Sequence, residues 1–242
     1  MFTLRPSATR GHANHGWLDS YHSFSFANYY DDKYMQYSVL RVINEDIIAP
    51  QMGFGMHSHR DMEILTYMLS GELRHTDSLG NGSVIKAGDV QRMTAGTGIR
   101  HSEANASANK SAHLLQIWLL PNALNLTPSY EEINFTQAQK HNKWCLLAEQ
   151  NPAVIAGKTA ALHIHQDLQL FATHLTKGSS LDYKLLPNRC AYLQLAKGSL
   201  VIDGLTLVAG DALVIEQEDN ITVSANDDAE ALLFDLPFFI KE

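Results

Sequence analysis

The feature that most constrains the fold of this chain is a succession of short β-rich runs separated by glycine-containing turns. The turns carry Gly-Asn-Gly at 80–82, Ala-Gly-Asp at 87–89 and Ala-Gly-Asp again at 209–211. The β-rich runs are 38–43, 63–69, 114–120, 170–175, 191–195, 200–202, 212–216 and 231–235. Many short strands at this spacing are typical of an all-β sandwich or barrel.

One pattern of strand, glycine turn, strand and Gly-Asp turn occurs twice in the chain. The run 67–73 contains Gly71 and is followed by Gly88-Asp89. The run 192–200 contains Gly198 and is followed by Gly210-Asp211. We interpret this weak repeat as two β-barrels of one type within a single chain.

The repeat predicts three segments along the chain. We expect a first barrel at 1–120, a linker at 121–160 and a second barrel at 161–242. Helical patterning is scarce, and the best candidate for a short helix is 136–149, in the linker. A weaker helical pattern covers 128–133.

The composition argues against several classes of function. The chain has 26 acidic and 18 basic residues and a net charge of −8, which disfavours binding to a nucleic-acid backbone. No run approaches the roughly 18 apolar residues of a membrane span, and the N-terminus lacks the apolar core of a signal peptide. The two cysteines, Cys145 and Cys190, have unrelated surroundings, so we expect free thiols and a cytoplasmic protein.

Two short motifs contain residues that bind metals. His57-Ser58-His59 and His101-Ser102-Glu103 each place two such residues at positions i and i+2. Side chains at that spacing point to the same face of a strand. Two strands would therefore bring three imidazoles and one carboxylate to a single point. This set suits a first-row divalent metal and leaves positions on an octahedral ion for substrate or dioxygen.

The other histidines lack a comparable second motif. His163 and His165 repeat the spacing of the first pair, but no further arm accompanies them, so we interpret them as an ordinary pair in a strand. His12, His15 and His22 lie in an N-terminal segment that is a candidate cover for the barrel mouth, and we assign them structural hydrogen bonding. The second barrel lacks ligands at the equivalent positions, which favours a role as a structural lid or an interface.

Longer motifs identify a resemblance to a known family. Residues 53–63 and 88–103 resemble the first and second cupin motifs. The opening Arg10-Gly-His-Ala-Asn-His-Gly-Trp-Leu-Asp-Ser-Tyr-His-Ser-Phe-Ser-Phe26 is typical of pirins, as are His57-x-His59-Arg-Asp-Met-Glu63 and Met93-Thr-Ala-Gly-Thr-Gly-Ile-x-His101-Ser-Glu103. The chain therefore resembles the pirin family of bicupins from about residue 2 to its end. In detail it is similar to the bacterial pirin-like proteins with quercetin 2,3-dioxygenase activity.

The resemblance implies a fold and a set of metal ligands. The fold would be two tandem jelly-roll-like cupin barrels, packed face to face, with a few short helices. The ligands would be His57, His59, His101 and Glu103. In general cupins the carboxylate ligand comes from the first motif, where Glu63 stands. A straight strand would carry Glu63 about 13 Å past His59, so we favour Glu103 as the ligand and leave Glu63 as a group that supports the ligands.

The resemblance also implies an activity and its cofactor. Our first hypothesis is a metal-dependent dioxygenase that opens the ring of flavonols such as quercetin with release of carbon monoxide. Glu103 would then act catalytically on the substrate hydroxyl. We favour Fe(II) as the metal, although Ni, Mn, Cu and Zn also accept this ligand set.

Two other hypotheses remain open. Pirins also act as metal-bearing binding proteins, so this chain would then be a redox sensor whose protein partner is a transcription factor or a metabolic enzyme. A non-redox cupin, such as a zinc isomerase, is the third. In each case we expect a monomer, because two barrels in one chain already satisfy the packing that single cupins obtain by dimerising.

Overall fold

The computed structural model describes residues 1–155 and 158–238, and strands dominate it. In this part of the chain the helical elements are α1 (Gln137–Lys140) and the 3-10 turns η1 (Ser7–Thr9) and η2 (Asp32–Tyr34). None of the helices in this part is long and apolar enough to cross a membrane. The prediction of an all-β fold with a few short helices is confirmed.

The chain divides into two compact units. The N-terminal unit consists of Arg10–Asn134 with Ile164–Gln166, and the C-terminal unit consists of Met1–Thr9, Phe135–His163 and Asp167–Glu242. The division into 1–120, 121–160 and 161–242 remains our proposal for the order of domains along the chain.

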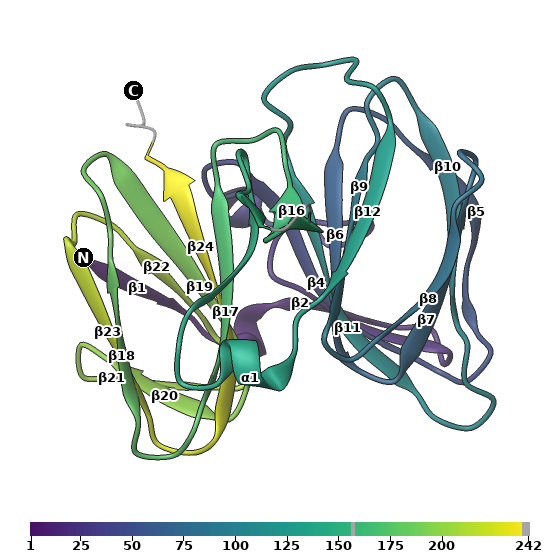
Figure 1. Ribbon diagram of the computed structural model, residues 1–242. Helices are drawn as coiled ribbons and strands as arrows, with labels where there is room; N and C mark the ends of the chain where they lie inside the picture. The colour runs from purple at the N-terminus through teal and green to yellow at the C-terminus, as the bar shows by residue number, and fades with distance from the viewer. Residues whose placement is uncertain (156–157, 239–242) are drawn as a thin grey trace. The chain divides into compact units, whose positions relative to one another are not determined.

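The N-terminal unit contains two antiparallel sheets. The larger sheet has the strand order β12-β9-β6-β11-β4-β3-β2, and the smaller sheet has the order β5-β10-β7-β8. Figure 1 shows the smaller sheet as a separate layer on its right-hand side. The strands are β2 (Gly11–Asn14), β3 (Leu18–His22), β4 (Leu40–Ile48), β5 (Gly53–His59), β6 (Glu63–Ser70), β7 (Glu72–Asp77), β8 (Gly82–Lys86), β9 (Asp89–Thr94), β10 (Ile99–Asn105), β11 (Ala112–Leu119) and β12 (Ser129–Asn134).

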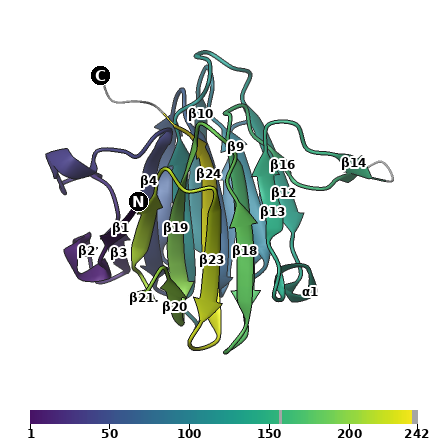
Figure 2. The same ribbon diagram turned by 90° about the vertical axis from the view of Figure 1, so that its left-hand side faces the viewer.

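The C-terminal unit repeats this plan. Its sheets have the orders β1-β22-β19-β24-β17-β13-β16 and β18-β23-β20-β21, and a short hairpin pairs β14 with β15. Figure 2 shows the smaller sheet on the side nearest the viewer. The strands are β1 (Phe2–Arg5), β13 (Cys145–Glu149), β14 (Val154–Ile155), β15 (Lys158–Thr159), β16 (Leu162–His163), β17 (Gln169–Leu175), β18 (Ser180–Lys184), β19 (Arg189–Lys197), β20 (Ser199–Ile202), β21 (Leu205–Val208), β22 (Ala212–Ile215), β23 (Asn220–Ala225) and β24 (Ala229–Pro237). Each unit is thus jelly-roll-like, with its strands in two facing sheets instead of a closed barrel.

The two units fill their interiors differently. The C-terminal unit has one large apolar core, in which leucines such as Leu193, Leu213 and Leu233 are fully buried. In the N-terminal unit, Met68 and Leu114 belong to one smaller apolar cluster, and Ile64 and Met93 belong to another. A cavity takes up part of the remaining interior of the N-terminal unit.

The predicted helices are largely wrong. A helix does begin in the linker, where Thr136 and Gln139 form a capping box, but it ends at Lys140. Residues 145–149 instead form strand β13, which pairs with β17, and 129–134 form strand β12, which pairs with β9. Hydrogen bonding to a neighbouring strand satisfies the backbone at both places, and this tertiary pairing overrides the local helical pattern.

Candidate metal centre

The pairing of β5 with β10 brings the two predicted motifs together. His57 lies directly opposite His101 in this antiparallel pair, and His59 lies opposite Ile99. Along β10 the side chains alternate, so that His101 and Glu103 are buried while Arg100 is exposed. The i, i+2 spacing in each strand therefore points all four predicted side chains into the interior of the N-terminal unit.

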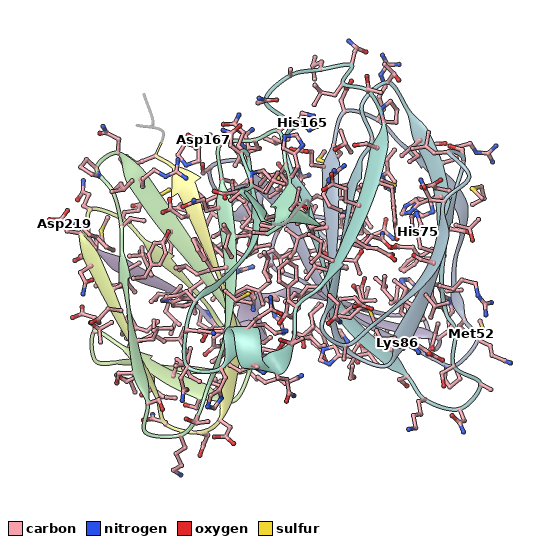
Figure 3. All side chains as sticks on the ribbon, in the orientation of Figure 1. Met52, His75, Lys86, His165, Asp167 and Asp219 are labelled. Carbon is pink, nitrogen blue, oxygen red and sulfur yellow. The ribbon has the colours of Figure 1, made fainter. Side chains whose placement is uncertain are left out.

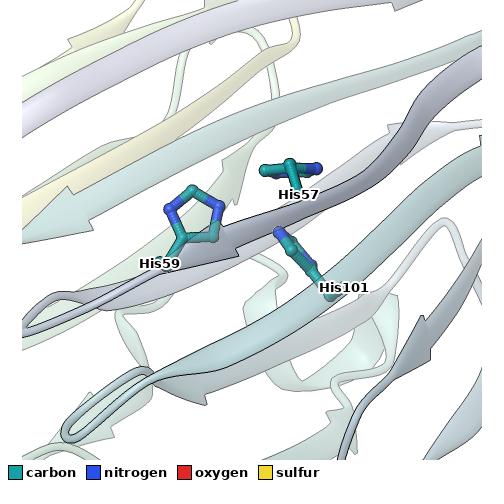
Figure 4. Close-up of side chains that lie close together, drawn as sticks. All are labelled: His57, His59 and His101. Carbon is teal, nitrogen blue, oxygen red and sulfur yellow. The ribbon is translucent and has the colours of Figure 1, made fainter.

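The three imidazoles converge on one point. Their ring centroids are 4.4 Å apart for His57 and His101, 4.9 Å for His59 and His101, and 4.8 Å for His57 and His59. One nitrogen from each ring lies within 4.8 Å of the other two. Figure 4 shows the rings of His57 and His59, from β5, turned toward the ring of His101, from β10. Rings at these distances can share one metal ion without movement of the backbone.

The hydrogen bonding of these histidines fits a metal ion. Among the described residues, both ring nitrogens of His101 and Nε2 of His59 are buried without a hydrogen-bond partner. A buried polar atom without a partner costs about 1–3 kcal/mol, and a bound cation removes that cost for a nitrogen with a free lone pair. This observation favours a cation among the three rings.

The protonation states of His59 and His101 also fit a metal ion. Burial lowers the pKa of His101 to about 3, with a further reduction from the neighbouring His57 and His75. Burial, together with His101 and His57, lowers the pKa of His59 to about 4, although Glu103 acts in the opposite direction. Both imidazoles are therefore neutral at neutral pH, the form in which histidine binds a metal.

The backbone of β5 orients His57. Nδ1 of His57 donates a hydrogen bond to the carbonyl oxygen of Gly55 at 2.8 Å, which leaves Nε2 with its lone pair free. The register between β5 and β10 shifts between His101 and Glu103, so β5 carries an additional residue there. Close to this bulge, a Cβ on Gly53 would lie 2.1 Å from the carbonyl oxygen of Glu103, so only glycine allows the two strands to approach.

Glu103 lies deeper in the interior than the histidines of β5. Its carboxylate accepts hydrogen bonds from Nε2 of Gln116 at 3.0 Å and from Oγ1 of Thr66 at 3.4 Å. A carboxylate oxygen of Glu103 lies within 4.8 Å of ligand atoms of His75 and His101. His101 therefore lies close both to the other two histidines and to Glu103. The two hydrogen bonds from Gln116 and Thr66 fix the position of the Glu103 carboxylate.

Sequence reasoning missed His75. It lies opposite Glu103 on β7, is fully buried, and contacts Oδ2 of Asp77 through Nε2 at 3.4 Å and Nε2 of Gln91 through Nδ1 at 3.3 Å. In Figure 3 it lies inside the N-terminal unit, between its layers of strands. No spacing in the sequence indicates this residue, because its position depends on the register between β7 and β10.

Glu63 has a different role. Its fully buried carboxylate accepts hydrogen bonds from the backbone N–H of His165 at 3.0 Å, the backbone N–H of Gln166 at 3.2 Å and Oγ1 of Thr94 at 3.3 Å. Nδ1 of His165, labelled in Figure 3, lies 2.9 Å from the same carboxylate. Glu63 therefore holds the segment Ile164–Gln166 in the N-terminal unit, and His165 is its partner.

Three of the candidate ligands, His57, His59 and Glu103, line a cavity of about 720 Å³ within the N-terminal unit. A volume of this size is typical of sites for drug-sized ligands. Its walls carry five aromatic side chains, which are Trp17, Phe26, Tyr29, Phe54 and Trp118. The predicted cover is present in part, because His12, His15 and His22 of the N-terminal segment also line this cavity. The candidate site therefore adjoins a largely apolar cavity that is large enough for an aromatic molecule.

Comparisons with known proteins agree with this geometry. The family profile described as Pirin matches residues 3–119, and the profile described as Quercetinase C-terminal cupin domain matches residues 154–236. The prediction of two cupin domains is thereby confirmed.

Similar proteins cover nearly the whole chain. The quercetin 2,3-dioxygenase of Escherichia coli strain K12 is 45% identical over 237 residues, which are 98% of this chain and 99% of that protein. The crystal structure of YhhW from Escherichia coli is 44% identical, covers 100% of both chains and has a TM-score of 0.92. A second structure, of the bacterial pirin YhhW in complex with nickel(II), is also 44% identical, covers 99% of this chain and 100% of that one, and has a TM-score of 0.91. Since these similarities extend over both cupin domains, the chain belongs to the pirin family.

Proposed function

We propose that this protein is a metal-dependent dioxygenase that cleaves flavonols such as quercetin, with His57, His59, His101 and Glu103 as the metal ligands. The observation that carries the proposal is the convergence of three imidazoles, two of which hold unpartnered buried nitrogens, beside an aromatic-walled cavity that His57 and His59 line. The similarity to a quercetin 2,3-dioxygenase over 98% of the chain supports the same reaction.

The cofactor is one divalent transition metal. Three neutral imidazoles and one carboxylate suit such an ion, and the nickel(II) complex of a 44% identical pirin supports a divalent metal here. We propose Fe(II) as the native ion, with Ni, Mn, Cu and Zn as ions that the same set accepts. The bound ion would supply a Lewis acid that lowers the pKa of a substrate hydroxyl and a centre at which dioxygen reacts.

The proposed ligand set favours one kind of substrate. One carboxylate among three neutral imidazoles leaves a net charge near +1 with a divalent ion, which favours an anionic oxygen ligand. A flavonol offers such an oxygen in its 3-hydroxyl group, which stands beside a 4-carbonyl group. The aromatic walls formed by residues such as Phe54 and Trp118 would hold the flat rings and exclude water.

Glu103 would take the proton of the 3-hydroxyl group. Its carboxylate is buried beside His101, and hydrogen bonds from Gln116 and Thr66 hold it in the position from which it would accept that proton. The flavonolate then reacts with dioxygen. Both oxygen atoms of dioxygen enter the organic products and one ring carbon leaves as carbon monoxide, so the balance needs no external reductant. Substrate and dioxygen are thus the small-molecule partners of the site.

The experiment measures quercetin consumption together with carbon monoxide release. The protein is first analysed for metal, then stripped and restored with Fe(II), Ni(II), Mn(II), Cu(II) or Zn(II). We expect release of carbon monoxide that requires a restored metal and dioxygen and that disappears in His101→Ala. A fully loaded protein without oxygen-dependent turnover under any metal would contradict the proposal and leave the hypothesis of a metal-bearing binding protein.

A further inference from the structure

A strip of polar side chains lines the cavity from the sheet that faces the metal centre. It consists of Ser20 and His22 on β3 and of Asn44 and Asp46 on β4, and we call it the polar strip. The register pairs Ser20 with Asp46 and His22 with Asn44, so the four side chains form two adjacent rows on one face. None of them belongs to a group that could hold a metal ion among the described residues.

The polar strip stands where a sandwich normally carries apolar residues. Inner faces of packed sheets are apolar because a buried polar group must be compensated by hydrogen bonds. Nearby inward positions follow that rule, since Leu18 and Ile48 belong to an apolar cluster. All four members of the polar strip are nevertheless buried, with exposed fractions of 2–4%. Because they line the cavity, we infer that these side chains bind a ligand and are not required for folding.

The hydrogen bonds within the polar strip leave acceptors free. Asp46 accepts a hydrogen bond from Oγ of Ser20, and Nδ1 of His22 lies 2.8 Å from Oδ1 of Asn44. An ionised carboxylate can accept about four hydrogen bonds, whereas the described side chains give Asp46 this single one. Because Asp46 lines the cavity, its carboxylate can accept further hydrogen bonds from a ligand bound there.

The position of the polar strip relative to the metal centre suits a long flat ligand. The histidines lie on the smaller sheet and the polar strip on the larger sheet of the same unit. Both groups line the same cavity of about 720 Å³, which has room for a flavonol-sized molecule. Aromatic side chains such as Phe26 and Trp118, which meet edge to face at 5.4 Å, form the wall between.

We propose that the polar strip is a second recognition site within this cavity, in which Asp46 and Asn44 accept hydrogen bonds from phenolic hydroxyls on the ring of the ligand farthest from the metal. The ligand class is a planar aromatic compound with a chelating oxygen at one end and phenolic hydroxyls at the other. This inference rests on the proposed function for its substrate class, and it adds the residues that set the preference among such compounds.

The test compares three flavonols that share the 3-hydroxyl and 4-carbonyl groups and differ in the pendant ring. Galangin has no hydroxyl on that ring, kaempferol has one and quercetin has two. Their dissociation constants are measured at pH 8, where Asp46 is mostly ionised. The readout is quenching of tryptophan fluorescence on nickel-loaded protein without dioxygen, since Trp17 and Trp118 line the cavity. The unmodified protein should bind quercetin about tenfold or more tightly than galangin, because hydrogen bonds to a carboxylate are strong.

The decisive variant is Asp46→Asn, which keeps the shape of the side chain. It should reduce the preference for quercetin over galangin to about twofold while galangin binds nearly as before. The matched control is Glu45→Gln, which removes the neighbouring carboxylate of β4 that pairs with Arg10 and does not line the cavity. It should keep the full preference. If Asp46→Asn does not fold, Asn44→Ala should give the same smaller ratio.

Two outcomes would overturn the inference. In one, the variants of the polar strip retain the preference of the unmodified protein. In the other, they lose affinity for all three flavonols equally. Because binding is measured without turnover, the result is independent of the proposed reaction. A protein that never releases carbon monoxide, yet whose preference depends on Asp46, would support the second recognition site and contradict the dioxygenase.

Discussion

Replacing Asp46 by asparagine should make the metal-free protein more stable at neutral pH. Asp46 is buried, and burial raises its pKa from 3.8 to about 7, although the hydrogen bond from Ser20 acts in the opposite direction. The native state therefore holds this proton more tightly than the unfolded chain does. The stability linked to this group is fully present below pH 3.8 and is lost as the pH rises toward 7.

The size of the effect follows from the two pKa values. A difference of about 3 pKa units corresponds to about 4 kcal/mol at about 1.4 kcal/mol per unit. An asparagine at this position does not titrate, so the free energy of unfolding of Asp46→Asn relative to the unmodified protein should rise by up to this amount between pH 4 and pH 8. The measurement is urea denaturation of the stripped protein, followed by tryptophan fluorescence at several pH values.

Asp77→Asn is the matched control. Burial alone would raise the pKa of Asp77, but hydrogen bonds from Asn81 and from the backbone N–H groups of Asn81 and Leu79 outweigh this and lower it. Asp77 thus contributes stability that is present above its unfolded pKa and lost only at lower pH, so Asp77→Asn should be destabilising by a constant amount from pH 5 to pH 8. If the change in the free energy of unfolding caused by Asp46→Asn were equally independent of pH, the reasoning about Asp46 would be refuted.

Three further substitutions test other parts of the site. Glu103→Gln should reduce turnover more than metal content, and a variant with full activity would remove Glu103 from its proton-accepting role. Gly53→Ala should weaken metal binding about tenfold or more, measured by competition with a chelator, because the new Cβ would push β5 away from β10. Glu63→Gln should cost about 2–3 kcal/mol in the free energy of unfolding because it removes hydrogen bonds to His165 and Gln166, with unchanged metal content.

The geometry of the two candidate metal-binding motifs was predictable because it is local. Positions i and i+2 share a face in any strand, so His57 with His59 and His101 with Glu103 needed no knowledge of the tertiary structure. Their approach to one another required only that β5 and β10 pair, which the resemblance to pirins implied. The fold class was predictable for a similar reason, since strand lengths and turns are local features.

The remaining features of the site depend on contacts between distant parts of the chain. His75 joins Glu103 only through the register of β7 and β10. Asp46 faces the cavity although a charged residue in a strand normally faces solvent, and nothing in its neighbourhood distinguishes it from the outward Glu45. The prediction of a helix at 136–149 was wrong for residues 145–149, because these residues pair with β17. That pairing joins segments distant in the sequence, so no local pattern indicates it.

The polar strip also predicts that stability and selectivity change in opposite directions in one variant. A buried carboxylate with one side-chain hydrogen bond costs free energy at neutral pH. A jelly-roll core does not require it, since the core cluster of the C-terminal unit consists mainly of leucine, isoleucine and alanine. Selection for folding alone would replace it. Asp46→Asn should therefore give a protein that unfolds at higher urea concentration and discriminates less between quercetin and galangin. A variant that gained stability and kept its discrimination would show that the carboxylate serves neither the fold nor the ligand proposed here.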